Sequence, residues 1–252
     1  MTSIGRYDDL KGMRVLVTGA SSGIGLACAE ALAEAGSMVA AHFRGQRAPV
    51  EALSAKHPRA IHAVRADLSE EAGCIEACKA ASAALGGLDG LVHSAGIWTD
   101  GPIREMSKQT LETIFRVNAF SSYYLAREAS RLMEKGSLVY IGSTAGQRGE
   151  PGHSHYAGSK GAVQSMVASL AQELAPGIRV NLVSPGWVRT PMSEEALIQR
   201  EASIVEAVPL KRVAEAEDVA ASALFLLSEA SRHLTGTDLC CSGGALLPMP
   251  RG

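Results

Sequence analysis

Short apolar runs of strand length alternate with longer segments of helical period along most of this chain. The runs predict strands at 15–17, 38–43, 60–65, 88–93, 137–141 and 178–183, and the longer segments predict helices at 24–35, 50–56, 70–85, 111–134 and 156–174. Helices of this length between strands require right-handed crossovers and a parallel sheet with both faces covered. The sequence therefore predicts a doubly wound α/β fold of about seven strands, as one domain over residues 1–252.

Charge, terminal segments and cysteines narrow the classes of function. The net charge is −2 without a Lys/Arg run, which argues against binding to nucleic acid or to an anionic membrane. Residues 1–11 lack the apolar centre of a signal peptide, and no stretch is long and apolar enough for a membrane span.

The five cysteines include no C-x-x-C pair, so we expect a reducing, cytoplasmic environment. Cys74 and Cys78 share a predicted helix face, but no His or carboxylate cluster completes a ligand set, and we predict no metal site.

A glycine-rich turn joins the first predicted strand to the first predicted helix, with the sequence Thr18-Gly19-Ala20-Ser21-Ser22-Gly23-Ile24-Gly25. Glycines there let the backbone turn tightly and let a pyrophosphate reach the N–H groups of a helix N-terminus, whose dipole favours an anion. Glycines also serve plain turns, but this position in the chain indicates a Rossmann-type dinucleotide site. The expected contacts are Gly19, Ser21, Ser22, Gly23, Ile24 and Gly25.

The spacing T-G-x-x-x-G-x-G resembles that of the short-chain dehydrogenase/reductase family, and the similarity extends over about residues 11–245. The resemblance implies an oxidoreductase that transfers a hydride between a nicotinamide dinucleotide and a ketone or secondary alcohol. It also implies a homotetramer, with the predicted helices at 111–134 and 156–174 as candidate interfaces.

The end of the second predicted strand bears on the choice of dinucleotide. The family's acidic position for NAD falls on Phe43, and Arg44 follows it. A carboxylate would bind the ribose 2′-hydroxyl of NAD, whereas an arginine can pair with the 2′-phosphate of NADP, unless Arg44 is only a solvated charge. We therefore predict NADP(H), with NAD(H) as the alternative. The resemblance implies further cofactor contacts at Asp67, Leu68, Ser94, Ala95 and Gly96. Asp67 could equally cap a helix. Ser94, Ala95 and Gly96 belong to an H-S-A-G segment where the family commonly has N-N-A-G.

Tyr156 and Lys160 are one helical turn apart and should emerge on the same helix face. A free tyrosine has a pKa near ~10, and a nearby ammonium would favour its phenolate. Such pairs also occur on ordinary helix surfaces, but here Ser143 precedes at a strand end, where its hydroxyl could hydrogen-bond a substrate oxygen. The resemblance identifies Tyr156 as the proton donor and acceptor. It places Lys160 on the nicotinamide ribose as well, and it gives Asn118 a role in a water-linked proton relay.

The segment after the sixth predicted strand matches the family's P-G-x-x-x-T pattern, which is expected to hold the nicotinamide through Pro185, Gly186, Val188 and Thr190. Tyr156 and Lys160 are also expected to contact the cofactor. Residues 191–210 are expected to form a lid over an apolar substrate pocket. The expected substrate contacts are Trp98, Ser143, His153, Tyr156 and Trp187, although a loop histidine such as His153 is more often solvated.

Several substrate classes are compatible with the sequence. The chain resembles the 3-oxoacyl-acyl carrier protein reductase group, with Arg131 where such enzymes carry a basic residue facing the carrier protein. A second basic position is occupied by Pro176 and Gly177, which weakens the argument for an acyl carrier protein as partner. A small ketone, quinone, sugar, polyol or steroid-like alcohol is the alternative. The alternative outside enzyme function is a non-catalytic NADP-binding redox sensor. A sensor, however, has no need of Ser143, Tyr156 and Lys160 together.

Overall fold

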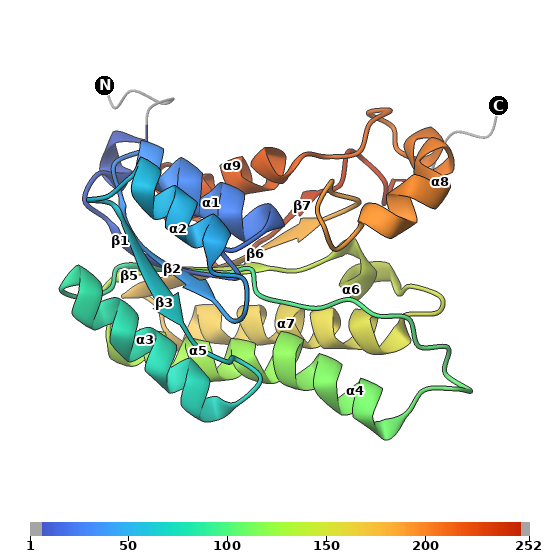
Figure 1. The fold of residues 1–252 in the computed structure, drawn as a ribbon, viewed down its shortest axis with the longest axis horizontal. Coiled ribbons are helices and arrows are strands. Elements are labelled where there is room, and N and C mark those ends of the chain that lie inside the picture. Colours follow the sequence, from blue (N-terminus) through green and yellow to red (C-terminus); the bar gives the residue numbers. More distant parts are fainter. Residues whose placement is uncertain (1–6, 248–252) are drawn as a thin grey trace.

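The computed structural model describes residues 7–247, so residues 1–6 and 248–252 of the predicted 1–252 domain lie outside the described part. A seven-stranded sheet in the order β3-β2-β1-β4-β5-β6-β7 forms the centre of the molecule, and all neighbouring strands are parallel (Figure 1). The strands are β1 (Arg14–Thr18), β2 (Met38–Phe43), β3 (Ile61–Arg65), β4 (Gly90–His93), β5 (Gly136–Ile141), β6 (Ile178–Pro185) and β7 (Asp238–Cys241). The prediction of a single doubly wound α/β domain with about seven strands is confirmed.

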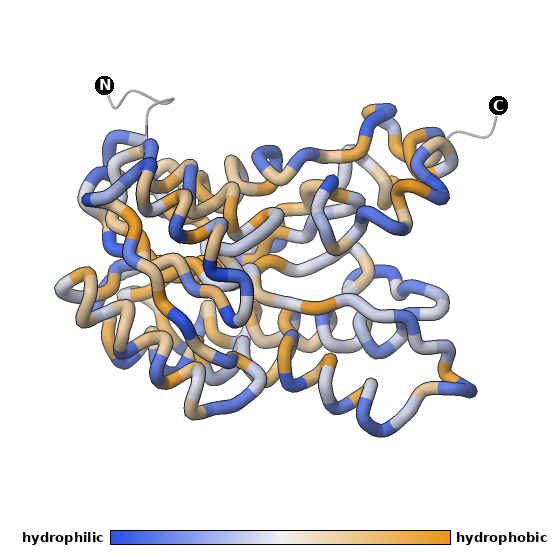
Figure 2. The backbone as a smooth tube through the Cα atoms, in the orientation of Figure 1, coloured by the Kyte–Doolittle hydropathy of each residue, from blue (hydrophilic) through white to orange (hydrophobic). Residues whose placement is uncertain are grey.

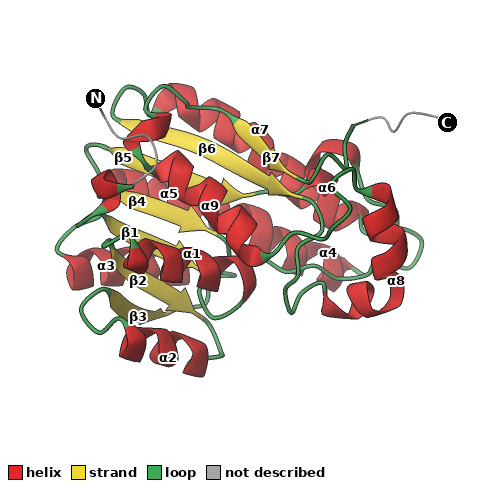
Figure 3. Ribbon diagram, turned by 90° about the horizontal axis from the view of Figure 1, so that it is seen from above, coloured by secondary structure: helices red, strands yellow, loops and turns green. Residues whose placement is uncertain are grey.

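Helices cover both faces of this sheet (Figures 1 and 3). One face carries α1 (Gly23–Glu34), α2 (Ala48–Lys56) and α9 (Ala216–Leu227), and the other carries α3 (Glu71–Leu85), α5 (Ser121–Arg131) and α7 (Ser154–Glu173). The remaining helices are α4 (Lys108–Phe115), α6 (Thr144–Arg148) and α8 (Glu194–Ala207), with 3-10 turns η1 (Asp8–Leu10) and η3 (Glu229–Ser231). Within residues 7–247 no helix has the length and apolar character needed to cross a bilayer.

The two cores follow from the alternation of side chains along each strand. Val15 and Val17 of β1 pack into the core under α1 and α9, whereas Leu16 between them packs into the core over α3 and α5. Figure 2 shows apolar residues recurring along these central strands. Strands buried on both faces have no room for a polar alternation, which explains why they appear in the sequence as continuous apolar runs.

One predicted helix is interrupted. The helix expected over 111–134 is α4 followed by a π-helical turn, η2 (Arg116–Phe120), and then α5. The N–H of Ser121 binds the carbonyl oxygen of Arg116, five residues earlier, instead of that of Val117. A single π turn changes the direction in which side chains leave the helix, and such turns are frequent at functional sites.

The order of the strands positions the site. The chain leaves β1 toward β2 on one side and later returns to β4 on the other, so the loops that follow β1 and β4 diverge at the carboxyl ends of these two neighbours. Ligands of open α/β sheets bind in the crevice at such a switch point. The glycine-rich turn after β1 and the H-S-A-G segment after β4 therefore meet at one edge of the sheet.

Candidate active site

The turn after β1 is shaped by glycines that admit no larger residue. Gly19 has a φ of +69°, and a Cβ on it would lie 2.9 Å from the backbone of Ala95. A Cβ on Gly25 would lie 2.3 Å from the carbonyl oxygen of Gly19, so this glycine lets α1 pack directly on the turn. Ser22 is the extended N-cap residue of α1. The turn thus presents the free N–H groups of a helix N-terminus to an open cleft, which fits a pyrophosphate.

Most of the predicted cofactor residues line this cleft. Those that do are Gly19, Ser21, Ser22, Gly23, Ile24, Arg44, Asp67, Leu68, Ser94, Ala95, Gly96 and Thr190. Gly25 does not line it and has the packing role described above. Sequence reasoning missed His42, whose Nδ1 accepts a hydrogen bond from the Gly19 N–H (3.2 Å) and whose Nε2 donates to the Ala66 carbonyl (3.1 Å). A histidine inside a strand carries no motif that would have identified it.

The adenosine end of the cleft is basic. Arg44 is exposed and lines the cleft, and no ion pair to it is found among residues 7–247. The side chain of Arg65 donates from Nε to the Arg44 carbonyl oxygen (3.2 Å). Asp67 accepts hydrogen bonds from the N–H (3.0 Å) and the hydroxyl (2.8 Å) of Ser69, and these bonds lower the pKa of Asp67. Asp67, the only carboxylate lining the cleft within the described part of the chain, is therefore already engaged.

The four predicted catalytic residues come from three segments at the far end of this cleft. Tyr156 and Lys160 leave the first turns of α7, Ser143 follows β5, and Asn118 lies on the π-helical turn. Ser143 is the N-cap of α6, with Oγ accepting a hydrogen bond from the Ala145 N–H (3.1 Å). Ser143, Tyr156 and Lys160 line one pocket together with the Gly96 backbone.

Asn118 holds the loop that follows β4. Its Oδ1 accepts from the Ile97 N–H (2.8 Å), and its Nδ2 donates to the Ile97 carbonyl (2.9 Å) and to Ser159 Oγ (3.1 Å). A Cβ on Gly96 would lie 3.2 Å from Asn118 Oδ1 and 3.6 Å from Lys160 Nζ. The small residues of the H-S-A-G segment therefore let the loop run directly over Asn118 and Lys160.

Electrostatics at Tyr156 differ from the sequence prediction. Lys160 Nζ lies 5.9 Å from the centre of the Tyr156 ring and donates a 2.8 Å hydrogen bond to the Ile141 carbonyl oxygen. Desolvation raises the pKa of Tyr156 to about 12, against the opposite effect of the neighbouring Ser143 hydroxyl. Desolvation lowers the pKa of Lys160 to about 8. Burial, which favours the neutral form of both groups, is thus the largest influence on the pKa of Tyr156, an effect that the sequence prediction did not include.

The segment after β6 forms the opposite wall of the same pocket. Pro185, Gly186, Val188 and Thr190 all line it, as predicted for the nicotinamide end. A Cβ on Gly186 would lie 3.2 Å from the backbone of Ser242, so this turn packs closely on the loop after β7. The predicted lid, 191–210, contains α8, and its first residues Met192 and Ser193 also line the pocket.

Two indole rings form an apolar corner of the pocket. Trp98 and Trp187 meet edge to face with ring centres 6.3 Å apart, and both line the pocket. His153 does not line it, because its ring is stacked on Trp98 at 4.3 Å and nearly parallel. The direct substrate contact expected of His153 is thus not supported. Exposed Arg148 and half-buried Glu150 come from the loop over 147–155, which we also expect at the pocket, and both line it; Glu150 Oε2 accepts from the Trp98 indole N–H (3.4 Å).

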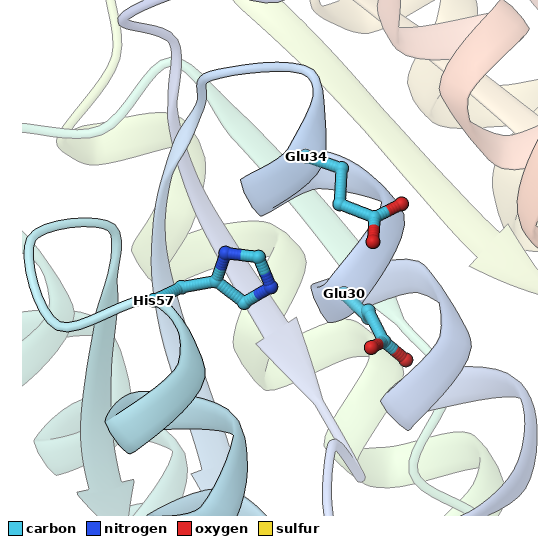
Figure 4. A group of neighbouring side chains, drawn as sticks. All are labelled: Glu30, Glu34 and His57. Atoms are coloured by element: carbon cyan, nitrogen blue, oxygen red, sulfur yellow. The ribbon is translucent and has the colours of Figure 1, made fainter.

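One group of side chains could be mistaken for a metal centre. Glu30 and Glu34 of α1 face His57 at the end of α2, with possible ligand atoms within 4.8 Å of one another (Figure 4). Lys56 Nζ lies 2.5 Å from Glu30 Oε1 and 3.4 Å from Glu34 Oε1. The lysine ammonium already pairs with both carboxylates, so we interpret this group as an ion-pair network that ties α1 to α2.

The cysteine pair of α3 is also poorly suited to bind a metal. Cys74 and Cys78 are both buried, and desolvation raises the pKa of each thiol to about 12. Metal ligation needs the thiolate, which burial in an apolar core disfavours.

Comparison with known proteins agrees with this geometry. Residues 19–245 match the family model described as enoyl-(acyl carrier protein) reductase. The chain is 38% identical to an uncharacterized oxidoreductase of Methylorubrum extorquens, covering 93% of this chain and 98% of the relative. It is 33% identical to the 3-oxoacyl-[acyl-carrier-protein] reductase FabG of Haemophilus influenzae, covering 94% and 100%.

Solved structures extend the likeness to three dimensions. A short-chain dehydrogenase/reductase of the glucose/ribitol dehydrogenase type from Brucella melitensis superposes with a TM-score of 0.89 at 33% identity, over 94% of this chain and 98% of that one. This chain belongs to the short-chain dehydrogenase/reductase family and is an oxidoreductase.

Proposed function

We propose that this enzyme interconverts a ketone and a secondary alcohol with NADP(H), and that Tyr156 is its general acid and base. The observation that carries the proposal is the convergence of Ser143, Tyr156 and Lys160 on one pocket next to the glycine turn. A nicotinamide cofactor, when bound, would supply or accept the hydride. Gly19, Ser22 and Gly23 would hold its pyrophosphate, and Val188 and Thr190 would hold its nicotinamide end.

The protein's own groups handle the proton. The Ser143 hydroxyl can donate a hydrogen bond to the substrate oxygen and stabilise the charge that develops on it. The high pKa of Tyr156 keeps its phenol protonated at neutral pH, so it is ready to donate a proton to that oxygen during carbonyl reduction. Lys160, held by the Ile141 carbonyl next to Asn118, provides an ammonium in the same pocket for replenishing that proton.

The electrostatics of the adenosine end favour NADP(H) over NAD(H). Arg44 lines the cleft as a free cation among the described residues, and Phe43 stands where an NAD-selective carboxylate would be expected. Asp67 is engaged with Ser69 and cannot readily take that role. A phosphate on the ribose 2′-oxygen would find a guanidinium partner here. The alternative is an NAD(H)-dependent dehydrogenase of a sugar, polyol or steroid-type alcohol.

The pocket walls favour a substrate with an apolar, ring-shaped body. Trp98 and Trp187 line the pocket with their ring planes nearly perpendicular, and Met192 adds a flexible apolar side chain. Reduction of a 3-oxoacyl thioester, the activity in the name of the Haemophilus relative, is a narrower version of the same chemistry. Docking of an acyl carrier protein has less support, because Arg131 already pairs with Glu128 (3.0 Å).

Assembly into a homotetramer is supported by exposed apolar side chains next to α5. Phe120 and Tyr123 are 47% and 49% exposed on one part of the predicted interface helix, and Leu132 follows its end at 39%. Large apolar side chains gathered on one helix surface mark interaction sites in soluble proteins. We propose that α5 packs against a second copy of the chain, in a cytoplasmic enzyme.

The proposed reaction is tested by following NADPH absorbance with a panel of ring ketones, aliphatic ketones, sugars and 3-oxoacyl thioesters. We expect turnover with at least one class, and the variant Tyr156→Phe should lose about 10²- to 10⁴-fold in kcat. NADPH binding by Tyr156→Phe, measured by fluorescence, should stay within the wild-type range. Full turnover by this variant would contradict the proton-transfer role, and NADPH binding without turnover on any class would favour the redox sensor.

A further inference from the structure

His93 lies at the carboxyl end of β4, buried beneath the loop that contributes Ser94 and Ala95 to the cleft. Its Nδ1 is 2.7 Å from Thr18 Oγ1 of β1, and its Nε2 is 3.1 Å from Ser121 Oγ at the start of α5. The imidazole therefore bridges the strand that leads into the glycine turn and the helix that begins after the π-helical turn.

The donors and acceptors around His93 fix the direction of each bond. Thr18 Oγ1 accepts from the backbone N–H groups of Ser94 and Ala95, both at 3.2 Å, so its own proton is free to go to His93 Nδ1. Ser121 donates its hydroxyl proton to the Val117 carbonyl at 2.6 Å, so it accepts from His93 Nε2. Only a neutral imidazole with the proton on Nε2 satisfies both neighbours.

The environment keeps His93 in that form. Burial lowers the pKa of His93 to about 3, and the charges of Lys160 and His42 act in the same direction. The ring also packs edge to face on Tyr140, with ring centres 5.8 Å apart. A charged His93 would turn an accepting nitrogen into a second donor and break the bond from Thr18.

The far end of this chain of bonds stabilises the π-helical turn. In an α-helix the N–H of Ser121 would bind the Val117 carbonyl, but here it binds that of Arg116. The Ser121 hydroxyl donates a hydrogen bond to the Val117 carbonyl instead. Ser122 repeats this with its own hydroxyl on the Asn118 carbonyl (2.8 Å). The hydroxyl that His93 orients therefore supports the carbonyl directly before Asn118.

We propose that His93 is a positioning residue that fixes the Ser94–Ala95 backbone, which lines the cofactor cleft, relative to the π-helical turn that carries Asn118. The inference rests on the proposed function, because it assigns these two parts to cofactor binding and proton transfer. Misplacement of either by about 1 Å is enough to cost about 100-fold in rate. Thr18 and Ser121 alone cannot replace the bridge, since each is already bonded to its own backbone partners.

Three variants separate positioning from packing. His93→Phe keeps a buried ring but removes both bonds, and we expect kcat to fall about 10- to 100-fold and the NADPH Kd to rise about 10-fold, with an unchanged substrate KM. His93→Gln can accept from Thr18 and donate to Ser121, so it should recover most of kcat. Tyr140→Phe is the matched control, because it changes the same buried cluster at a hydroxyl that has no partner among the described residues. It should keep the wild-type kcat and Kd.

Ser121→Ala supplies a test that does not require the His93 variants to be equally stable. It removes only the link to the π-helical turn, so kcat should fall while the NADPH Kd stays close to wild type. Because His93 and Ser121 act in one chain of bonds, the double variant His93→Phe/Ser121→Ala should lose less kcat than the two single losses combined. Additive losses would overturn the inference, as would wild-type kcat and Kd in a folded His93→Phe protein.

Failure of the proposed reaction would give a different result. If the wild type reduced no carbonyl of the panel, the NADPH Kd values would still be measurable. A weakened Kd in His93→Phe that His93→Gln restores would then support the link to the cofactor cleft, and equal Kd values in all variants would overturn it.

Discussion

Lys160 donates a 2.8 Å hydrogen bond to the carbonyl oxygen of Ile141, and the same nitrogen lies 5.9 Å from the centre of the Tyr156 ring. The ammonium is thus held by strand β5 and lines the same pocket as the phenol, one helical turn away on α7. Both groups are desolvated, which lowers the pKa of Lys160 to about 8 and raises that of Tyr156 to about 12. Keeping Lys160 charged in this desolvated site therefore costs free energy, and a bound anionic or polar partner can reduce that cost.

The contribution of Lys160 to the stability of the cofactor-free enzyme should rise with pH between about 8 and 10.5. In this window the unfolded chain, with an ordinary lysine pKa of 10.5, binds more protons than the folded one, whose Lys160 pKa is about 8. The contribution is on the order of 1 kcal/mol per pH unit at most. The buried Cys28, Cys74 and Cys78 thiols and the Tyr156 phenol, whose pKa values are all raised to about 12, act in the opposite sense at high pH, because the folded state then holds the extra protons. Urea unfolding at pH 7.5, 9 and 10 measures the effect.

Lys160→Met is the control for this pH dependence. It removes the titrating ammonium and keeps a long apolar side chain, so the free energy of unfolding of the wild type should rise relative to that of Lys160→Met between pH 8 and 10. If the wild type and Lys160→Met had parallel pH profiles, the lowered pKa of Lys160 could not be the source.

Arg44→Gln should raise the KM for NADPH about 10- to 100-fold and leave the KM for NADH nearly unchanged. A hydrogen bond to a charged group contributes about 1.5–3 kcal/mol, and only NADPH carries the 2′-phosphate that would receive it. Arg47→Gln is a matched control, since Arg47 pairs with Glu51 (2.7 Å) and does not line the cleft. A wild-type preference for NADH, or equal loss with both cofactors in Arg44→Gln, would reject the assignment.

Most of the architecture could be predicted from periodicity, because strands such as β2 and β5 are buried on both faces and appear as continuous apolar runs. The spacing of Tyr156 and Lys160 placed both on one face of α7 without any tertiary information. The π-helical turn could not be predicted this way, since the helical pattern continues through Arg116–Phe120. Its local support, the hydroxyls of Ser121 and Ser122, has meaning only once the register is known.

Other features depend on contacts that spacing does not encode. His153 is close to Tyr156 in sequence, yet its stacking on Trp98 places it behind the pocket wall. The pKa shifts of Tyr156 and Lys160 come from burial at the meeting point of several segments, and a motif carries no information about burial. Glu150 joins the pocket through a bond to Trp98, a residue more than 50 positions away.

Trp98→Ala should reduce kcat/KM for ring ketones more than for a small aliphatic ketone such as butanone. The indole faces supply the contact area for a ring, and loss of one aromatic contact is expected to cost about 0.5–1.5 kcal/mol beyond the buried area. A small ketone reaches Tyr156 and Ser143 without filling the corner, so it serves as the internal control. An equal loss for both substrates would mean that Trp98 acts by supporting the loop and not by contacting substrate.

The double variant Phe120→Glu/Tyr123→Glu should convert the enzyme into a smaller assembly. Both side chains are about half exposed in the single chain, and burying two carboxylates in an apolar interface without partners would be strongly unfavourable. Size-exclusion chromatography with light scattering measures the mass directly. Ile103→Glu is the matched control, because Ile103 is 75% exposed but lies in the loop before α4, away from the proposed interface helix. A wild type that is monomeric, or a double variant with the mass of the wild type, would show that α5 does not form the interface.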